Sequence, residues 1–154
     1  MQYLYTALLV VHILSAILGV GPVFLINMIL SKSRTAEQLR YAHRIVNRLN
    51  RNANMSFVLI LLTGLAMGGL NPWLFRMEWY IAALTLFFIS GVFATTAVEP
   101  LLKQMGRIAA QTENDHGDVP LEHVALFRKK QVRDRVSNII AIVIILLMVV
   151  KPAF

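Results

Sequence analysis

The chain has 154 residues, of which 57% are hydrophobic and none is cysteine, and its formal net charge at pH 7 is +7. This length corresponds to a single domain. The lack of cysteine excludes disulfides, thiolate-ligated haem, iron–sulfur clusters and cysteine-ligated zinc. In chain order, four long apolar runs cover residues 3–30, 55–70, 79–98 and 136–150.

Each apolar run approaches or exceeds the roughly 17–25 residues that a helix needs to cross about 30 Å of hydrocarbon. The fourth run reaches this length only if Arg135 extends its charged head back to the interface. The alternating pattern of a membrane β-barrel is missing. The sequence therefore predicts an all-α integral membrane protein, a four-helix bundle with cytoplasmic helical extensions, in which residues 1–154 form one transmembrane domain.

Basic residues gather in the two segments that link the first run to the second and the third to the fourth. Segments 31–52 and 99–135 hold thirteen of the fifteen lysines and arginines, and the positive-inside rule places such segments in the cytoplasm. Aromatic residues that suit the opposite, outer interface are Tyr3, Tyr5, Trp73, Trp79 and Tyr80. We therefore expect both termini outside, and we attribute the positive charge to topology, with no nucleic-acid partner.

The first basic segment has the pattern of a short amphipathic helix. Thr35 and Gln38 have the spacing of a capping box, and apolar residues then recur at helical intervals. The polar face of this helix carries a basic stripe made of Arg40, Arg44, Arg48 and Arg51. Such a stripe suits anionic lipid headgroups, and an acidic partner is the alternative.

The second basic segment is predicted to extend the third helix and then return. The third helix continues through residues 101–111, the chain turns over residues 112–120, and a helix beginning at Leu121 runs directly into the fourth apolar run.

His12 is the one ionisable side chain deep within an apolar run. It lies about nine residues from the outer start of the first helix, hence roughly 14 Å along the axis at 1.5 Å per residue. An imidazole at this depth needs a hydrogen-bond partner or a metal. Two interpretations stay open: a functional ligand, or a neutral histidine satisfied by Thr63 or by a backbone carbonyl of a neighbouring helix.

Three features of the sequence carry a resemblance to known families. They are the run Leu9-Val10-Val11-His12-Ile13-Leu14-Ser15-Ala16-Ile17-Leu18-Gly19-Val20-Gly21, the later Leu62-Thr63-Gly64, and Trp79 at the start of the third run. With these, nearly the whole chain resembles a bacterial family of four-helix predicted integral membrane proteins of unknown function. That family is distantly similar to the copper-resistance membrane domain of the D type and to the four-helix membrane protoporphyrinogen oxidase.

The resemblance implies a haem or metal site centred on His12 and a location in the bacterial inner membrane. The oxidase offers a lysine and a second histidine after the tryptophan of its third helix, and neither occurs in residues 79–84 here. The resemblance therefore carries over at His12 only, and whether the protein is an enzyme stays open.

For a b-type haem on His12, the second axial position has several candidates. They are a methionine, water, an empty position, or His12 of another subunit in a homodimer. Met67 lies at a comparable depth on the antiparallel second helix, which makes it the internal candidate, with Thr63 nearby. The alternative function is a non-catalytic membrane component or a small transporter without a cofactor, although proton-coupled transport normally needs mid-membrane carboxylates that this chain lacks.

Overall fold

The computed structural model describes residues 2–112 and 117–152, so residues 113–116 of the predicted turn lie outside the described part. The elements are, in chain order, α1 (Gln2–Ser31), α2 (Ala36–Leu70), the 3₁₀ helix η1 (Pro72–Arg76), α3 (Glu78–Phe93), the π-helical segment η2 (Ala94–Val98), α4 (Glu99–Gln111) and α5 (Leu121–Val150). Within the described residues the only β contact is an isolated bridge between Thr35 and Asp118. The predicted all-α helical bundle is confirmed.

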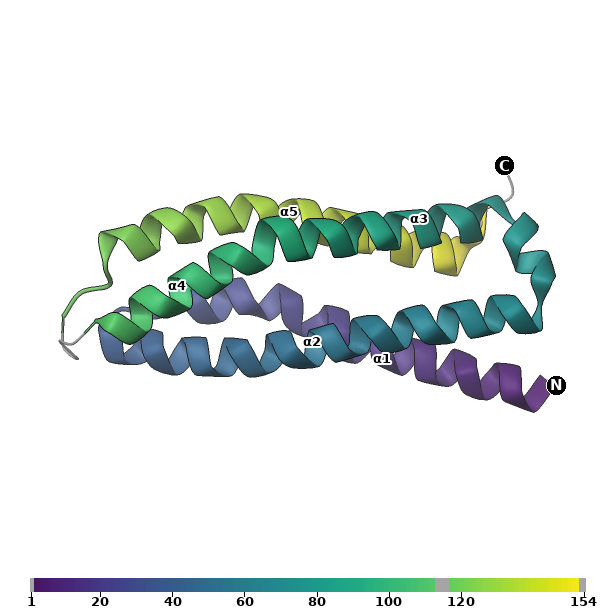
Figure 1. The fold of residues 1–154 in the computed structure, drawn as a ribbon, viewed down its shortest axis with the longest axis horizontal. Coiled ribbons are helices and arrows are strands. Elements are labelled where there is room, and N and C mark those ends of the chain that lie inside the picture. Colours follow the sequence, from purple (N-terminus) through teal and green to yellow (C-terminus); the bar gives the residue numbers. More distant parts are fainter. Residues whose placement is uncertain (1, 113–116, 153–154) are drawn as a thin grey trace.

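The helices form two antiparallel pairs that lie along one long axis (Figure 1). The first pair is α1 with α2, and the second is the continuous rod α3–η2–α4 with α5. The start of α1 and the end of α5 lie at one end of the molecule, and the α1–α2 and α4–α5 connections lie at the other (Figure 1).

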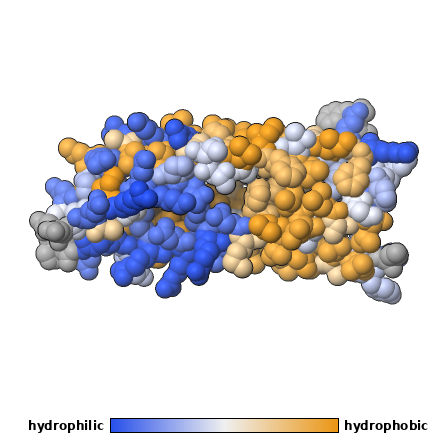
Figure 2. Space-filling model, in the orientation of Figure 1, coloured by the Kyte–Doolittle hydropathy of each residue, from blue (hydrophilic) through white to orange (hydrophobic). Residues whose placement is uncertain are grey.

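Polar and apolar surfaces divide the bundle across its long axis (Figure 2). We call residues 2–25, 55–98 and 136–150 the apolar half. The remaining described residues between Ile26 and Arg135 form the polar half. The basic segments and the α1–α2 and α4–α5 connections belong to the polar half, as the charge pattern predicts.

Close packing is concentrated in the polar half. Its core is a cluster of buried side chains from α1, α2 and α4, namely Ile26, Leu30, Ala42, Val46, Leu102 and Met105. In water, burial of such side chains is the main favourable term in folding. In the apolar half, side chains such as Ile17 and Val149 are 62% and 73% exposed. Hydrocarbon solvates these side chains as well as a protein core does, so the hydrophobic effect does not drive the helices together there.

Among the described residues, three helical segments are long and apolar enough to cross a membrane by length and composition: Gln2–Ser31, Ala36–Leu70 and Glu78–Gln111. The fourth predicted span, residues 136–150, belongs to α5 but is preceded by Arg133, Asp134 and Arg135. Its 15 residues reach only about 22 Å at 1.5 Å per residue. The fourth apolar run is thus shorter than the hydrocarbon core of a bilayer.

The short amphipathic helix expected in the first basic segment is the first half of α2. Thr35 caps α2, because its side-chain oxygen accepts a hydrogen bond from the Gln38 amide at 3.3 Å. The Gln38 side chain in turn accepts from the Arg34 amide at 3.0 Å. No break follows before Leu70, so the basic stripe runs along the bundle axis and does not lie flat on a membrane surface.

The third helix continues past the apolar half as predicted, with one local change of pitch. Pro100 lacks an amide hydrogen, and the turn before it widens into the π-helical segment η2. Arg133 of α5 donates a hydrogen bond to the Ala97 carbonyl oxygen at 2.5 Å. This contact ties α5 to the altered turn.

Candidate ligand-binding site

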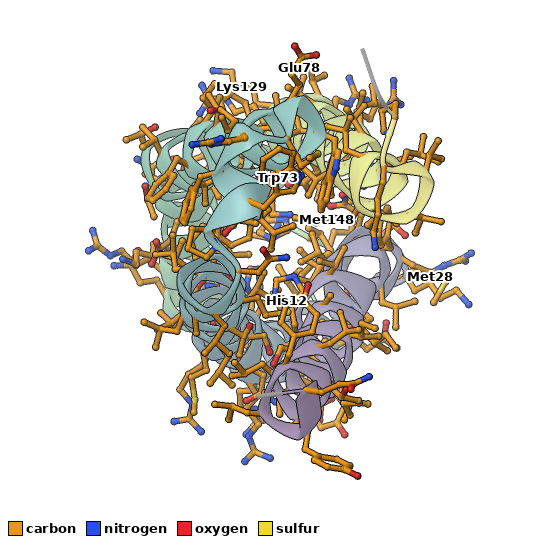
Figure 3. All side chains as sticks on the ribbon, turned by 90° about the vertical axis from the view of Figure 1, so that its right-hand side faces the viewer. His12, Met28, Trp73, Glu78, Lys129 and Met148 are labelled. Atoms are coloured by element: carbon orange, nitrogen blue, oxygen red, sulfur yellow. The ribbon has the colours of Figure 1, made fainter. Side chains whose placement is uncertain are left out.

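His12 lies on the side of α1 that faces α2, in the apolar half (Figure 3). In the turns of α1 that follow His12, the two helices approach closely because Ser15 and Gly19 are small and buried. A Cβ atom added to Gly19 would lie 2.5 Å from Cβ of Ser56, which real structures do not tolerate. This close approach brings the imidazole within reach of α2.

The hydroxyl of Thr63 determines which nitrogen of His12 carries the proton. Thr63 has one hydroxyl proton, which it donates to the carbonyl oxygens of Leu59 at 2.6 Å and Ile60 at 3.2 Å. Its oxygen is therefore the acceptor in the 2.8 Å contact with Nδ1 of His12. The network assigns the proton of the neutral ring to Nδ1 and leaves a lone pair on Nε2.

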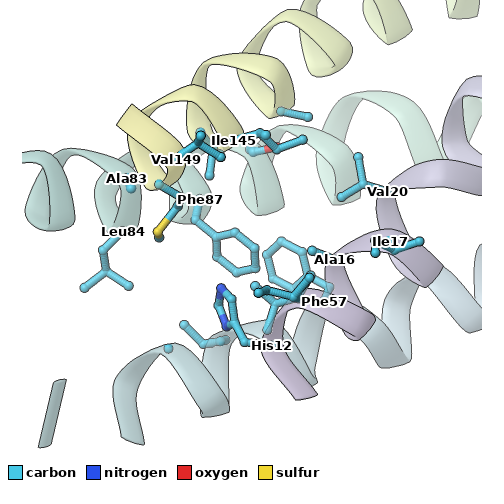
Figure 4. A pocket seen from close by; sticks show the side chains of 18 of the residues that line it. His12, Ala16, Ile17, Val20, Phe57, Ala83, Leu84, Phe87, Ile145 and Val149 are labelled. Atoms are coloured by element: carbon cyan, nitrogen blue, oxygen red, sulfur yellow. The ribbon is translucent and has the colours of Figure 1, made fainter. Parts of the chain in front are cut away.

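Nε2 is at the tip of the ring, and the hydrogen bond to Thr63 is made by the other nitrogen, Nδ1. The imidazole points into a cavity of about 560 Å³ (Figure 4). The walls of this cavity come from α1, α2, α3 and α5, and its polar lining side chains are His12, Tyr80 and Ser90. Ligand sites in proteins have this character: mostly apolar walls with few polar groups.

Aromatic rings form part of the cavity wall. Phe57 of α2 and Phe87 of α3 stack with their ring centroids 4.0 Å apart and an interplanar angle of 15°. Nearer the end of the bundle that holds the start of α1 and the end of α5, the Tyr80 hydroxyl donates to the Gly64 carbonyl oxygen at 2.9 Å. These contacts hold α2 against α3 on one side of the cavity.

The predicted ligand residues differ in their relation to the cavity. His12 lines it, and Thr63 is buried behind the imidazole and holds it. Met67 is also buried, at 7% exposure, but it is not among the lining residues. The methionine that does line the cavity is Met148 of α5. Depth along a helix, on which the choice of Met67 was based, does not determine the direction in which a side chain points.

A second polar group, which the sequence did not reveal, is buried in the polar half. The Nε2 atoms of His43 and His123 are 2.9 Å apart, with ring planes at 89°, so one ring donates to the other. Near them, Lys130 contacts Asp134 at 2.5 Å and the Asn27 side-chain oxygen at 3.3 Å. The histidines are 80 positions apart in the chain, so no local pattern could pair them.

Burial lowers the pKa of both His43 and His123. Desolvation, then the neighbouring His123 and Lys130, lowers the pKa of His43 to about 4. Desolvation also lowers the pKa of His123. Both rings are therefore neutral at pH 7. Nδ1 of His43 is buried without a hydrogen-bond partner among the described residues.

The four arginines of the basic stripe have different surroundings. Arg40 donates to the Thr112 carbonyl oxygen at 2.5 Å and helps to hold the end of α4. Arg44 is exposed and lies 5.7 Å from the centroid of the Tyr41 ring. Arg48 and Arg51 are exposed and closest to the apolar half.

Among the described residues there is no group of three or more histidine, cysteine, aspartate or glutamate side chains that could hold a metal ion. A metal-containing group on His12 would therefore have to bring most of its own ligands, as a porphyrin does.

Long helices with apolar outer surfaces and a basic polar end define an all-helical integral membrane protein. The chain belongs to the family described as "Predicted integral membrane protein (DUF2269)", whose model matches residues 6–152. No curated protein and no solved structure matches it. The four-helix membrane family inferred from the sequence is thus confirmed, and the more distant similarities stay predictions.

Proposed function

We propose that the protein binds a b-type haem in the cavity of the apolar half, with His12 as the axial ligand. The observation that carries the proposal is the orientation of His12. Thr63 holds the proton on Nδ1, and the lone pair of Nε2 is directed into a cavity of about 560 Å³. Metal-bound histidines in proteins share this arrangement, in which the second ring nitrogen donates to a fixed acceptor.

The surroundings of His12 fit a porphyrin in two respects. The walls are apolar, with the stacked rings of Phe57 and Phe87 among them. The carboxylates of a haem need cations, and Lys151 lies at the outer end of α5, with its amino group 5.8 Å from the Trp79 ring centroid. Lys151 follows Val149, which lines the cavity, by two positions.

A haem in this place would supply one-electron chemistry, or the protein would carry haem itself. His12 positions and orients the group, and the apolar walls exclude water from it. Met148, which lines the cavity, would be the second residue to hold the iron, in preference to Met67, which does not line it. Histidine and methionine together would give low-spin iron of raised potential, and histidine alone would leave a position open to small molecules. His12 of a second subunit is the homodimeric alternative.

The test is the absorption spectrum of protein purified in mild detergent after expression with ample haem. We expect a Soret band that His12→Ala abolishes or shifts, while circular dichroism shows unchanged helix content. Met148→Leu should convert a low-spin spectrum to a high-spin one, and Met67→Leu serves as its matched control. A colourless protein that also fails to bind added haem would refute the proposal.

The alternative is a carrier or membrane component that binds a neutral lipophilic molecule and no cofactor. The assigned tautomer favours a particular ligand in that case. The lone pair of Nε2 accepts a hydrogen bond, so it would recognise a hydroxyl group and not a carbonyl. Binding of a lipophilic alcohol by a haem-free preparation, lost in His12→Ala, would favour this alternative.

For the whole molecule we propose insertion in the bacterial inner membrane with the polar half in the cytoplasm and both termini outside. The asymmetry of basic residues supports this orientation. We further propose that Arg48 and Arg51 contact anionic headgroups, since they lie at the border of the apolar half.

A further inference from the structure

The cavity beside His12 is open on one side. A side chain that lines a closed cavity is buried, yet several lining residues are strongly exposed on the outer surface. On α1, Ile13 is 49% and Ile17 62% exposed; on α5, Ile145 is 44% and Val149 73% exposed. In contrast, every lining residue on α2 and α3 is buried or half-buried. The opening therefore lies between α1 and α5.

The spacing of the exposed lining residues supports this location. On α1 they are Ile13, Ile17, Gly21 and Phe24, which recur every three or four residues and form one edge of the helix. Ile145 and Val149 form the corresponding edge of α5. α1 packs mainly on α2, and α5 packs mainly on α3 and α4. The two edges thus border a gap between the helix pairs.

We infer that the ligand of this cavity enters and leaves sideways, from the bilayer, through the opening between α1 and α5. The inference rests on the proposed function in that it assumes a ligand for the cavity. It adds the route and the class of ligand: a molecule that dissolves in the hydrocarbon of the membrane.

The physical reason is the position of the opening along the bundle. Both edges belong to the apolar half, the part of the molecule that we place in the bilayer. A polar ligand arriving by this route would lose its hydration in hydrocarbon, which costs several kcal/mol per unpaired group. Towards the other end of the bundle, Ile26, Val46 and Met105 are close-packed. The lateral opening is consequently a route for lipophilic molecules.

Gly21 is the position at which the opening can be altered with least disturbance. It is exposed and lines the cavity, and a Cβ atom added there meets nothing within 4 Å. A phenylalanine at this position would place a ring at the opening, and its Cβ atom has room. Leu18 is the matched control, since it lies on the same helix, is 64% exposed and does not line the cavity.

The first experiment needs no haem. A tryptophan reporter is placed in the cavity by Leu84→Trp, with Trp73→Phe and Trp79→Phe, in vesicles whose lipid chains carry bromine, a contact quencher. We expect quenching of at least half that of the lipid-facing reporter Phe88→Trp. Adding Gly21→Phe should lower the quenching of the cavity reporter more than two-fold, and Leu18→Phe should not change it. A cavity reporter that bromine does not quench, or that Gly21→Phe leaves unaffected, would overturn the inference.

The second experiment follows transfer of haem from loaded vesicles to the reconstituted protein by the growth of the Soret band. We expect Gly21→Phe to slow the transfer at least five-fold and to leave the final spectrum unchanged, with Leu18→Phe at the parent rate. Equal rates for all three proteins would overturn the lateral route. If no variant takes up haem, the proposed cofactor is wrong, and the quenching experiment still decides whether the cavity opens to the bilayer.

Discussion

The hydrogen bond to Thr63 fixes the orientation of the His12 imidazole and the nitrogen that carries its proton. The threonine hydroxyl donates to backbone carbonyls of its own helix, as threonines in helices often do. Its oxygen can therefore only accept from the imidazole. As a result, the half-buried His12 is held in one orientation, with the lone pair of Nε2 facing the cavity.

Thr63→Val tests this role, because it keeps the shape of the side chain and removes the acceptor. We expect haem affinity to fall about 10–100-fold, the usual effect of losing the partner of a metal-bound histidine. Haem titration followed by absorbance measures the change. Thr85→Val, an exposed threonine of α3, is the control and should bind as the parent does.

The buried pair His43–His123 predicts that stability falls in acid. The folded protein lowers the pKa of His43 to about 4, below the ordinary histidine value of 6.5. Between these values the unfolded chain binds more protons, so the free energy of unfolding is largest above pH 6.5 and decreases as the pH falls towards 4. Unfolding of the detergent-solubilised protein should show a loss of roughly 2–3 kcal/mol between pH 7 and pH 4.5.

Leucine substitutions test whether the His43–His123 pair causes the pH dependence of stability. His43→Leu alone leaves His123 without its partner and should cost about 1–3 kcal/mol at pH 7. The double variant with His123→Leu replaces both polar groups and should cost less, with a flatter pH profile. A pH profile identical to that of the parent would show that other groups govern the acid response.

At the scale of the helices, the continuity of α2 decides which basic residues can reach lipid. The apolar run of α2 begins at Met55. At 1.5 Å per residue, Arg51 lies about 6 Å beyond that point and Arg40 about 22 Å. The headgroup layer on each side of a bilayer is only about 5–8 Å thick. Arg40, held by Thr112, thus belongs to the packing of the polar half.

We therefore expect Arg48→Gln with Arg51→Gln to reduce retention of anionic lipid by the purified protein, at about 1 kcal/mol for each arginine. Arg44→Gln, further from the apolar half, should have a smaller effect. Mass spectrometry of co-purified lipid from mixed micelles, at low and high salt, measures the retention. Equal losses for the two variants would indicate that the stripe contacts lipid along its whole length.

At the scale of the whole molecule, helix packing in the two halves is stabilised by different interactions, because water surrounds the polar half and hydrocarbon the apolar half. Water drives the packing of the polar half, where the helix pairs meet through the apolar cluster and the buried histidines. Hydrocarbon offers no such drive in the apolar half, and there the pairs leave a cavity between them. The polar half thus holds the pairs together while the apolar half can accept a ligand.

The proposed orientation is testable because the chain has no cysteine. Ser33→Cys, in the α1–α2 connection, should be shielded from a membrane-impermeant thiol reagent in intact cells. Asn71→Cys, at the opposite end of the bundle, should be labelled. The reverse pattern would invert the topology and move His12 to the inner half of the membrane.

The local features of the sequence were sufficient for the membrane class, the helices, the cap at Thr35 and the isolation of His12. Each depends on hydropathy, spacing or residue type within a short window, and such properties survive any arrangement of the helices. Thr63 was one of the two partners expected for His12, and the two side chains are in contact at 2.8 Å.

Relations between distant helices depended on tertiary structure. The rotation of each helix about its axis put Met148, and not Met67, on the cavity wall. A side-chain hydrogen bond between α2 and α5 joined His43 to His123 across 80 positions. The cavity and its lateral opening exist only because two helix pairs separate where hydrocarbon replaces water. Periodicity reports which face of a helix is apolar, whereas the neighbour of that face is set by the packing of the whole chain.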